Sequence, residues 1–295
     1  RPFVLGACFA LIGAFLSSTP PFQNAMAMDA NRCGIPVVYG FCRGVGSVSY
    51  AAAVLLLGFV LERHAPTLLL PVFAALTACG LLAMSGFRLP ERPDEAADRP
   101  AEHRSIAAVL RSHPRFALTL LGCMFFFLTH TISNTYMNAL VGKAGGTASA
   151  VGTSLAISAV LELPAMTLVS RLQKRFSPGF FLRFAAGAEV VKFLIFYLAR
   201  SMPLIYLGHC MQFFQFAVYA PATVYYVAAA LPERDQLKGQ SLIYVAGSGL
   251  GGALGNLLGG RLLDRSGIQA ALLLGTVSAA ASLLTFCLST REDSR

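Results

Sequence analysis

The chain has 295 residues, of which 56% are hydrophobic and only 13% are charged, and its mean hydropathy is +0.64. Soluble domains carry about 25% charged residues, so this composition excludes a water-soluble globular protein. The net charge of +9 could suit a nucleic-acid partner. However, Lys and Arg cluster in short segments between apolar stretches, as membrane topology requires. We therefore expect membrane lipid, and no nucleic acid, around this protein.

In chain order, nine apolar segments are long enough to cross a bilayer as helices. A hydrocarbon core about 30 Å thick requires about 20 apolar residues, each adding about 1.5 Å. Strands of a membrane barrel would alternate in polarity, and none of these segments does. The predicted spans are residues 2–28, 36–61, 66–87, 116–141, 148–169, 179–199, 202–231, 240–263 and 267–289.

A hydrophilic stretch divides these spans into three and six. Residues 88–113 are rich in Pro, Glu, Asp and Arg and are predicted to form a linker. We therefore expect residues 1–87 to supply three helices of an N-terminal half and residues 114–295 to form a six-helix C-terminal half. Residue 1 is Arg and no signal peptide precedes the first span, so we expect the sequence to be a fragment.

Positive charge predicts the orientation of the chain. Most of the 23 Lys and Arg residues fall in one set of alternate connections, which includes the linker and the C-terminus. Cytoplasmic connections carry an excess of Lys and Arg. The linker at residues 88–113 and the C-terminus are therefore expected in the cytoplasm, in a protein that crosses the cell membrane, a bacterial inner membrane, many times.

The seven cysteines are scattered and form no C-x-x-C pair. Most lie in apolar runs, so neither a disulfide framework nor a zinc site is predicted. No nucleophile–base pair, metal-ligand cluster or phosphate loop stands out either. The sequence therefore predicts no metal, no cofactor and no catalytic residue, and the protein is not expected to be an enzyme.

Local motifs resemble those of the major facilitator superfamily, in particular the branch of lactose permease and the nucleoside:proton symporters. Residues 39–50 resemble the Y/F-G-x-x-R-x-x-G-S/C signature at the start of the fifth helix. Residues 162–164 match a Glu-x-Pro-like element of the eighth helix, and residues 171–175 the basic turn after it. Residues 247–255 are similar to the body of the eleventh helix.

Such a resemblance implies an all-α major facilitator bundle of twelve transmembrane helices, of which nine are present and the first three are lacking. It implies a secondary transporter that moves a small polar solute, such as a nucleoside, a sugar or an aromatic acid, together with protons. A drug or metabolite efflux carrier and a non-transporting, receptor-like protein on the same scaffold are the alternatives. We expect a monomer.

The resemblance also implies part of a substrate site. Arg43 corresponds to an arginine that helps to bind sugar in lactose permease-like carriers, and Tyr50 to a stacking aromatic residue. A guanidinium can make bidentate hydrogen bonds to hydroxyls or to a carboxylate, although Arg43 could instead hold the end of its helix. Asn24 occupies the position of an acidic partner and cannot ionise, so recognition of galactosides in particular is not expected.

Polar side chains mark one face of two predicted spans. His130 and Asn134 lie on the first, and His209, Gln212 and Gln215 lie on the second. Polar stripes on membrane helices face protein or water rather than lipid. We expect His130 and the amide side chains of both stripes to bind substrate. Histidine titrates near physiological pH, so His209 is the candidate proton relay, with an interhelical hydrogen bond as the alternative.

Three charged side chains inside apolar spans are candidates for coupling. A charge at the centre of a membrane helix costs about 2.5–3.5 kcal/mol on insertion scales, which favours a cavity or a partner. Glu162 is therefore the main candidate for proton or substrate coupling, against a structural hydrogen bond. Glu189 and Lys192 are three residues apart on one helical face and can pair, either in coupling or as a structural ion pair.

Glycines recur every four residues in the eighth predicted span, at Gly247, Gly251, Gly255 and Gly259. Small residues let helix backbones approach closely in lipid, so this face is predicted to be a packing seam. The run also matches G-x-G-x-x-G, but that dinucleotide-binding fingerprint requires a preceding strand. Inside an uncharged span, helix packing is the prediction.

Overall fold

The structure, a computed structural model, describes residues 2–61, 66–86 and 105–290, and within these ranges helices are the only regular secondary structure. Helices make up most of the described residues of each of the nine predicted spans, so the all-α prediction is confirmed. The elements are α1 (Pro2–Arg32), α2 (Tyr39–Leu61), η1 (Pro66–Leu68), α3 (Leu69–Ser85), α4 (Ile106–Ser112), α5 (Pro114–Thr135), α6 (Met137–Lys143), α7 (Ala148–Leu172), α8 (Pro178–Leu198), α9 (Met202–Cys210), η2 (Met211–Phe213), α10 (Phe216–Ala230), α11 (Glu233–Tyr244), the π-helical η3 (Val245–Gly251), α12 (Gly252–Ser266) and α13 (Ile268–Ser289).

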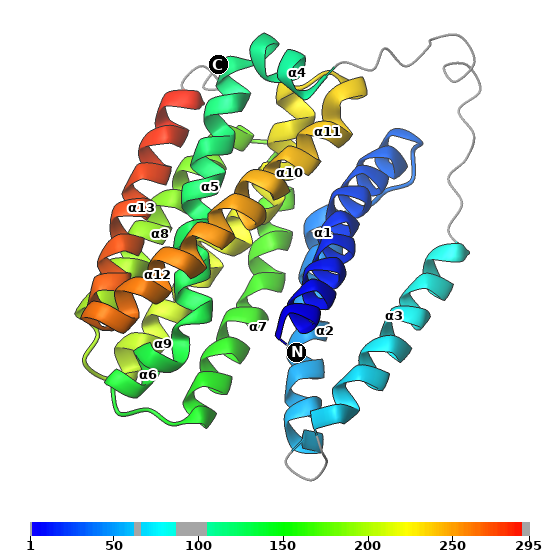
Figure 1. The fold of residues 1–295 in the computed structure, drawn as a ribbon. Coiled ribbons are helices and arrows are strands. Elements are labelled where there is room, and N and C mark those ends of the chain that lie inside the picture. The colour runs from blue at the N-terminus through cyan, green and yellow to red at the C-terminus, as the bar shows by residue number, and fades with distance from the viewer. Residues whose placement is uncertain (1, 62–65, 87–104, 291–295) are drawn as a thin grey trace.

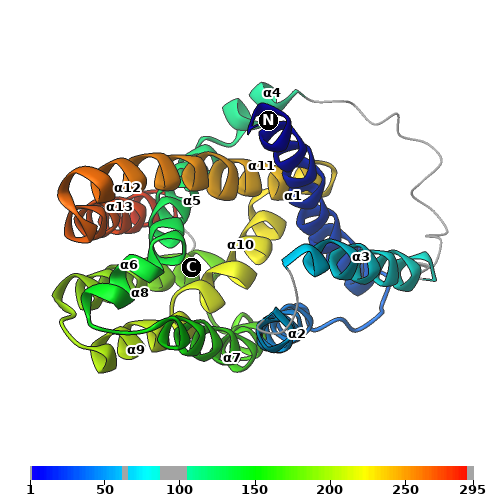
Figure 2. The ribbon, with the colours of Figure 1, turned by 60° about the horizontal axis from the view of Figure 1, so that its bottom comes forward.

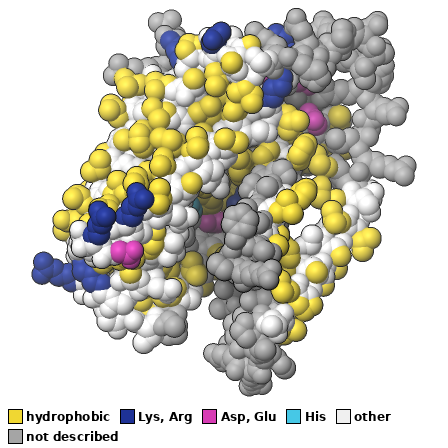
Figure 3. All heavy atoms as spheres, in the orientation of Figure 1, with side chains coloured by type: hydrophobic (Ala, Val, Ile, Leu, Met, Phe, Trp, Pro, Cys, Tyr) yellow, Lys and Arg dark blue, Asp and Glu magenta, His cyan; other side chains and the backbone are white. Residues whose placement is uncertain are grey.

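The described helices have the length and composition of membrane spans. Five stretches, among them α5, α13 and the stretch from α11 through α12, are long and apolar enough to cross a bilayer. In α8, 21 residues long, the apolar sequence carries Arg183, Glu189 and Lys192. Figure 3 shows hydrophobic side chains over the middle of the visible face, with Lys and Arg gathered towards its two ends.

The helices form two groups, which we name the N-terminal helices (α1–α3) and the C-terminal bundle (α5–α13) (Figure 1). Within the bundle, α5 and α8 pack against α13, and α10 packs against α7 and α8. The two groups meet where α2 runs along α7 and where α1 crosses α11 (Figure 2). The outermost helix, α3, leaves most of its large apolar side chains exposed.

The contact between α2 and α7 depends on two glycines. The amide nitrogen of Gly40 donates a hydrogen bond of 2.9 Å to Ser170 Oγ. A Cβ atom on Gly44 would lie only 2.6 Å from the Cα atom of Leu163. The two backbones therefore approach as closely as small residues allow in membrane helices.

The predicted linker is only partly described. Residues 88–104 lie outside the described ranges, but Ile106–Ser112 form the short helix α4. The side chain of Ser105 caps this helix by accepting a hydrogen bond from the backbone of Ala108. Val109 is completely buried in the core cluster of the bundle, so α4 is anchored to the bundle.

Three of the predicted continuous spans are interrupted, which corrects the prediction. One span divides into α9, η2 and α10, with a non-helical backbone at Gln215 (φ −99°, ψ −94°). A second ends as α6 after a break at Tyr136, and a third contains the π-helical η3. Such breaks are tolerated at membrane depth where protein or a cavity surrounds them.

All four glycines of the predicted seam are buried and face α5. Residues four apart in an α-helix drift by about 40° per step, since a turn takes 3.6 residues. The wider π-helical turn of η3 lies between Gly247 and Gly251 and offsets one step of this drift. The glycine face therefore stays directed at α5 over its whole length.

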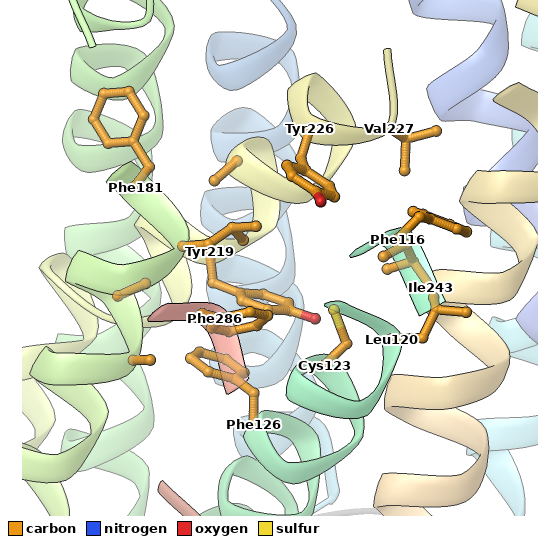
Figure 4. Packing of buried hydrophobic residues seen from close by; sticks show 14 of the residues in the cluster. Phe116, Leu120, Cys123, Phe126, Phe181, Tyr219, Tyr226, Val227, Ile243 and Phe286 are labelled. Atoms are coloured by element: carbon orange, nitrogen blue, oxygen red, sulfur yellow. The ribbon is translucent and has the colours of Figure 1, made fainter. Parts of the chain in front are cut away.

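Aromatic rings fill the centre of the bundle between α5, α10 and α13. Tyr219 stacks on Phe126 with ring centroids 3.9 Å apart, and Phe286 of α13 lies beside them. Figure 4 shows the Tyr219 hydroxyl directed towards Cys123 of α5. These contacts fix α10 against α5, and Tyr219 also lines the cavity described below.

The substitution Gly251→Ala should destabilise the bundle by about 1–3 kcal/mol, because the added methyl group would meet the backbone of Met124 and Leu128, which cannot rotate away. The matched control is Gly249→Ala, where the nearest atom would be 3.7 Å away. That change should be neutral or slightly stabilising, since Ala favours helix over Gly. Thermal unfolding in detergent micelles measures both, and equal midpoints for the two variants would contradict the packing role.

Candidate functional site

A cavity of about 580 Å³ lies between the N-terminal helices and the C-terminal bundle. Polar side chains of α1 and α2 line one side of it, and mainly aromatic side chains of the bundle line the other. Arg43 is the one charged side chain among the described residues of this lining. The lining includes Gln23, Asn24, Tyr39, Cys42, Arg43, Phe127, Phe216, Tyr219, Thr223, Tyr244 and Ser248.

The polar wall is held together by hydrogen bonds between α1 and α2. The Tyr39 hydroxyl donates to Asn24 Oδ1 over 2.7 Å. Tyr244 of α11 interacts with both Asn24 and Arg43, so a residue of the bundle completes this wall. Asn24 therefore stays in the site as a hydrogen-bond acceptor, and Arg43 has no carboxylate opposite it in the described lining.

The aromatic wall consists of Phe127, Phe216 and Tyr219. The Phe127 ring makes T-shaped contacts with both other rings. Its centroid lies 6.3 Å from that of Phe216 and 5.8 Å from that of Tyr219. His130 stacks on Phe216 with ring centroids 4.5 Å apart, and its Nε2 lies 3.1 Å from Asn134 Nδ2. His130 and Asn134 thus lie behind the wall and not among the residues that line the cavity.

A line of buried hydrogen bonds leads from the cavity into the bundle. Arg43 Nη1 donates to Ser47 Oγ over 3.5 Å, and Ser47 donates to Glu162 Oε2. Gln212 Nε2 donates to Glu162 Oε1 over 2.9 Å, and Gln212 Oε1 accepts from Lys192 Nζ over 2.9 Å. We name these five residues the polar line; it joins two cations to one acid.

The polar line crosses from α2 to α7 at the hydrogen bond between Ser47 and Glu162. Both residues are nearly buried, at 5% and 8% exposed. Sequence reasoning identified Glu162 but missed Ser47. The available signal was its position four residues after Arg43, which places a small hydroxyl side chain on the same face of α2.

Glu189 and Lys192 act on each other's charge, but no direct hydrogen bond joins them in this structure. Lys192 Nζ donates to the amide oxygens of Gln212 and Gln215, at 2.9 Å and 3.5 Å, instead of to Glu189. Neither carboxylate oxygen of the fully buried Glu189 has a hydrogen-bond partner of ordinary geometry among the described residues. The break between α9 and α10 brings both glutamines to Lys192, which helical spacing alone does not reveal.

Other predicted site residues lie apart from the cavity. His209 is buried and its Nδ1 lies 3.1 Å from Ser158 Oγ, outside the polar line. Tyr50 is 58% exposed and does not line the cavity. Gln212 and Gln215 surround Lys192 instead of the cavity. Of the predicted substrate-binding residues, Asn24 and Arg43 alone line the described cavity.

No group of three or more His, Cys, Asp or Glu side chains that could hold a metal ion occurs in the described part of the chain. Its seven cysteines are free thiols. The described lining of the cavity offers hydrogen-bonding groups, the charge of Arg43 and aromatic surface.

Comparison with known proteins identifies a family. The sequence profile of the MFS_1 like family matches residues 3–274. A maltose permease of Geobacillus stearothermophilus is 28% identical over 286 residues, which cover 96% of this chain and 71% of the permease. An uncharacterised transporter of Bacillus subtilis, YwbF, is 23% identical over 293 residues, which cover 99% of this chain and 71% of that protein.

Solved structures share the fold. FucP, a Major Facilitator Superfamily transporter solved in the outward conformation, matches with a TM-score of 0.58 at 17% identity, over 92% of this chain and 69% of FucP. A structure of the E. coli fucose:proton symporter FucP matches with a TM-score of 0.54 over 79% of this chain.

The cavity predicts a difference in thiol reactivity. Cys42 lines the cavity and is exposed, whereas Cys123 is fully buried in the bundle. N-ethylmaleimide should therefore modify Cys42 in the folded protein and reach Cys123 only after unfolding, as peptide mass spectrometry would show. Cys79, exposed on α3, controls for reagent activity. Cys42 reacting as slowly as Cys123 would show that the cavity is closed to small molecules.

Proposed function

Because the chain belongs to the MFS_1 like family of major facilitator transporters, we propose that it carries a small sugar across the membrane together with a proton, by alternating access. Members of this family are transporters and not enzymes. The observation that supports the proposal best is the cavity itself, because its polar wall connects through Ser47 to the buried acid Glu162. A site for solute thus adjoins the buried ionisable groups that proton coupling requires.

The cavity suits the two-sided chemistry of a sugar. Hydroxyl groups can bond to Arg43 and Asn24, while the apolar face of a sugar ring can lie against Phe127 and Phe216. Its volume of about 580 Å³ lies within the range of about 300–1,000 Å³ usual for small-molecule sites. The names of two similar proteins, a maltose permease and a fucose:proton symporter, favour a sugar over a nucleoside or an aromatic acid.

Coupling between solute and proton follows from Ser47, which makes hydrogen bonds with both Arg43 and Glu162. Ser47 has one hydroxyl proton, which it donates to Glu162, while its oxygen accepts from Arg43. A solute that draws Arg43 towards the cavity weakens this arrangement and changes the hydrogen bonding of Glu162. Binding of solute and the hydrogen bonding of Glu162 are thereby linked through one side chain.

Alternating access requires the N-terminal helices and the C-terminal bundle to move as bodies, and we propose that they belong to the two halves of the carrier, joined by the linker. The close approach of α2 and α7 at Gly40 and Gly44 lies at the end of the molecule where α4 lies (Figure 1). The positive-inside bias assigns that end, with the C-terminus, to the cytoplasm of a bacterial cell. In this orientation α2 and α7 of a single copy of the protein are in close contact near its cytoplasmic side.

The full-length protein, purified and reconstituted into vesicles, should accumulate radiolabelled maltose or fucose when an inward proton gradient is imposed. A protonophore should abolish the accumulation but leave downhill entry, because only the uphill step needs the gradient. Vesicles without protein measure leakage. Accumulation that survives the protonophore would contradict proton coupling, and failure to move either sugar while a hydrophobic dye is exported would favour the efflux alternative.

The substitution Arg43→Lys should raise the KM for the transported sugar about 10-fold or more. Lysine keeps the charge but loses the planar pair of donors, and a hydrogen bond to a charged group contributes about 1.5–3 kcal/mol. The matched control is Arg171→Lys at an exposed position of α7, which should leave the KM unchanged. Initial rates of uptake measure both, and an unchanged KM for Arg43→Lys would remove this residue from the binding site.

A further inference from the structure

Two buried acids of the bundle have opposite surroundings. Glu162 accepts hydrogen bonds on both carboxylate oxygens, from Ser47 and from Gln212. Glu189 is fully buried, and neither of its oxygens has such a partner among the described residues. Burying an ionised group without a partner costs far more than burying the neutral acid. The surroundings therefore suit a carboxylate at Glu162 and a protonated acid at Glu189.

Lys192 lies between these two acids. Its charge acts on both Glu189 and Glu162, but its Nζ donates to the amide oxygens of Gln212 and Gln215. Glu189 is three residues earlier on the same helix, within reach of the flexible Lys192 side chain. One ammonium group can therefore serve either acid, and its hydrogen bonds decide which.

Gln212 connects Lys192 to Glu162 and to no other acid. Its Nε2 donates to Glu162, and its Oε1 accepts from Lys192, both over 2.9 Å. An amide has a donor end and an acceptor end. The reverse orientation would point its oxygen at a carboxylate and its NH₂ group at an ammonium. Gln212 therefore fits between an anion and a cation in one orientation, and it lies outside the described cavity lining.

We propose that Gln212 is a positioning residue that holds Lys192 towards Glu162, so that the coupled proton is carried by Glu189. While Gln212 bridges Lys192 and Glu162, Glu189 keeps its proton. When the bridge opens, Lys192 turns to Glu189, the O–H bond of the acid breaks, and its proton passes to water as the ammonium–carboxylate pair forms. The transport consequence, though not the protonation of Glu189, rests on the proposed function.

Few other charged or titratable groups face this acid. Tyr219 of α10 acts on Glu189 directly, and Gln215 lies near it without a hydrogen bond of ordinary geometry. His130 and His209 approach from α5 and α9, and both interact with Lys192. The helix α13 also packs against α8 and brings no Asp, Glu, Lys, Arg or His. Lys192 is therefore the cation placed to draw the proton from Glu189.

Infrared spectroscopy of the purified protein tests the protonation of Glu189 without any sugar. A protonated carboxyl group absorbs separately from a carboxylate, and exposed acids are ionised at neutral pH. We expect a protonated-carboxyl band at neutral pH that is lost in Glu189→Gln and retained in Glu162→Gln. Absence of the band from the parent protein, or its loss in Glu162→Gln alone, would overturn the proposal.

The role of Gln212 is tested in the Glu162→Gln background, where Glu189 is the remaining acid of the two. Adding Gln212→Leu frees Lys192 to turn to Glu189, so the band should be lost. The matched control adds Gln240→Leu instead, which removes another buried glutamine, on α11, that is 3% exposed. The protonated-carboxyl band should remain in this control. A band that survives Gln212→Leu would show that Gln212 does not position Lys192.

Transport separates this inference from the proposed function. In reconstituted vesicles, Glu189→Gln should abolish proton uptake driven by maltose or fucose, while exchange of the sugar across the membrane continues because it moves no net proton. Proton uptake equal to that of the parent would overturn the assignment to Glu189. If the parent moves neither sugar, the proposed function fails, and the infrared result still decides the state of Glu189.

Discussion

Charged side chains that are buried among membrane helices must be neutralised within the protein, because hydrocarbon offers neither water nor counter-ions. Here Glu162 of α7 and Lys192 of α8 find their hydrogen-bond partners on α2 and in the break between α9 and α10. Each of these elements must hold its position for the charges to stay satisfied. The hydrogen bonds of the polar line therefore form only when these helices pack in this arrangement, and they in turn stabilise the packing.

The helices could be predicted from sequence because a bilayer demands long apolar runs with internally satisfied backbones. Their interruptions could not. The break at Gln215 and the π-helical η3 are stable only because neighbouring helices surround them. The helix propensity of a short segment contains no information about such neighbours. The linker was predictable as a hydrophilic stretch, but not the anchoring of α4 through Val109, which depends on a pocket built by distant residues.

For the site, sequence reasoning found the ionisable residues and missed how they are connected. Glu162 stood out because charge in an apolar span is costly, and Arg43 stood out through the family resemblance; both belong to the polar line. The pairing of Glu189 with Lys192 was inferred from helical spacing, which shows which groups can meet and not which partner is nearer. Ser47 carries no such cost, and its spacing of four residues from Arg43 was its only signal, although it joins the two groups of helices.

The π-helical turn also constrains how this sequence can change. Each residue of an α-helix advances about 100° around its axis, so deleting one residue of the regular α-helix between η3 and Gly255 would rotate everything that follows it by that amount. Gly255 and Gly259 would then leave α5, and bulkier neighbours would take their places against Leu128 and Ile132. A length change here is consequently not absorbed locally as it would be in a loop. It would have to be matched by a second irregular turn in the same helix.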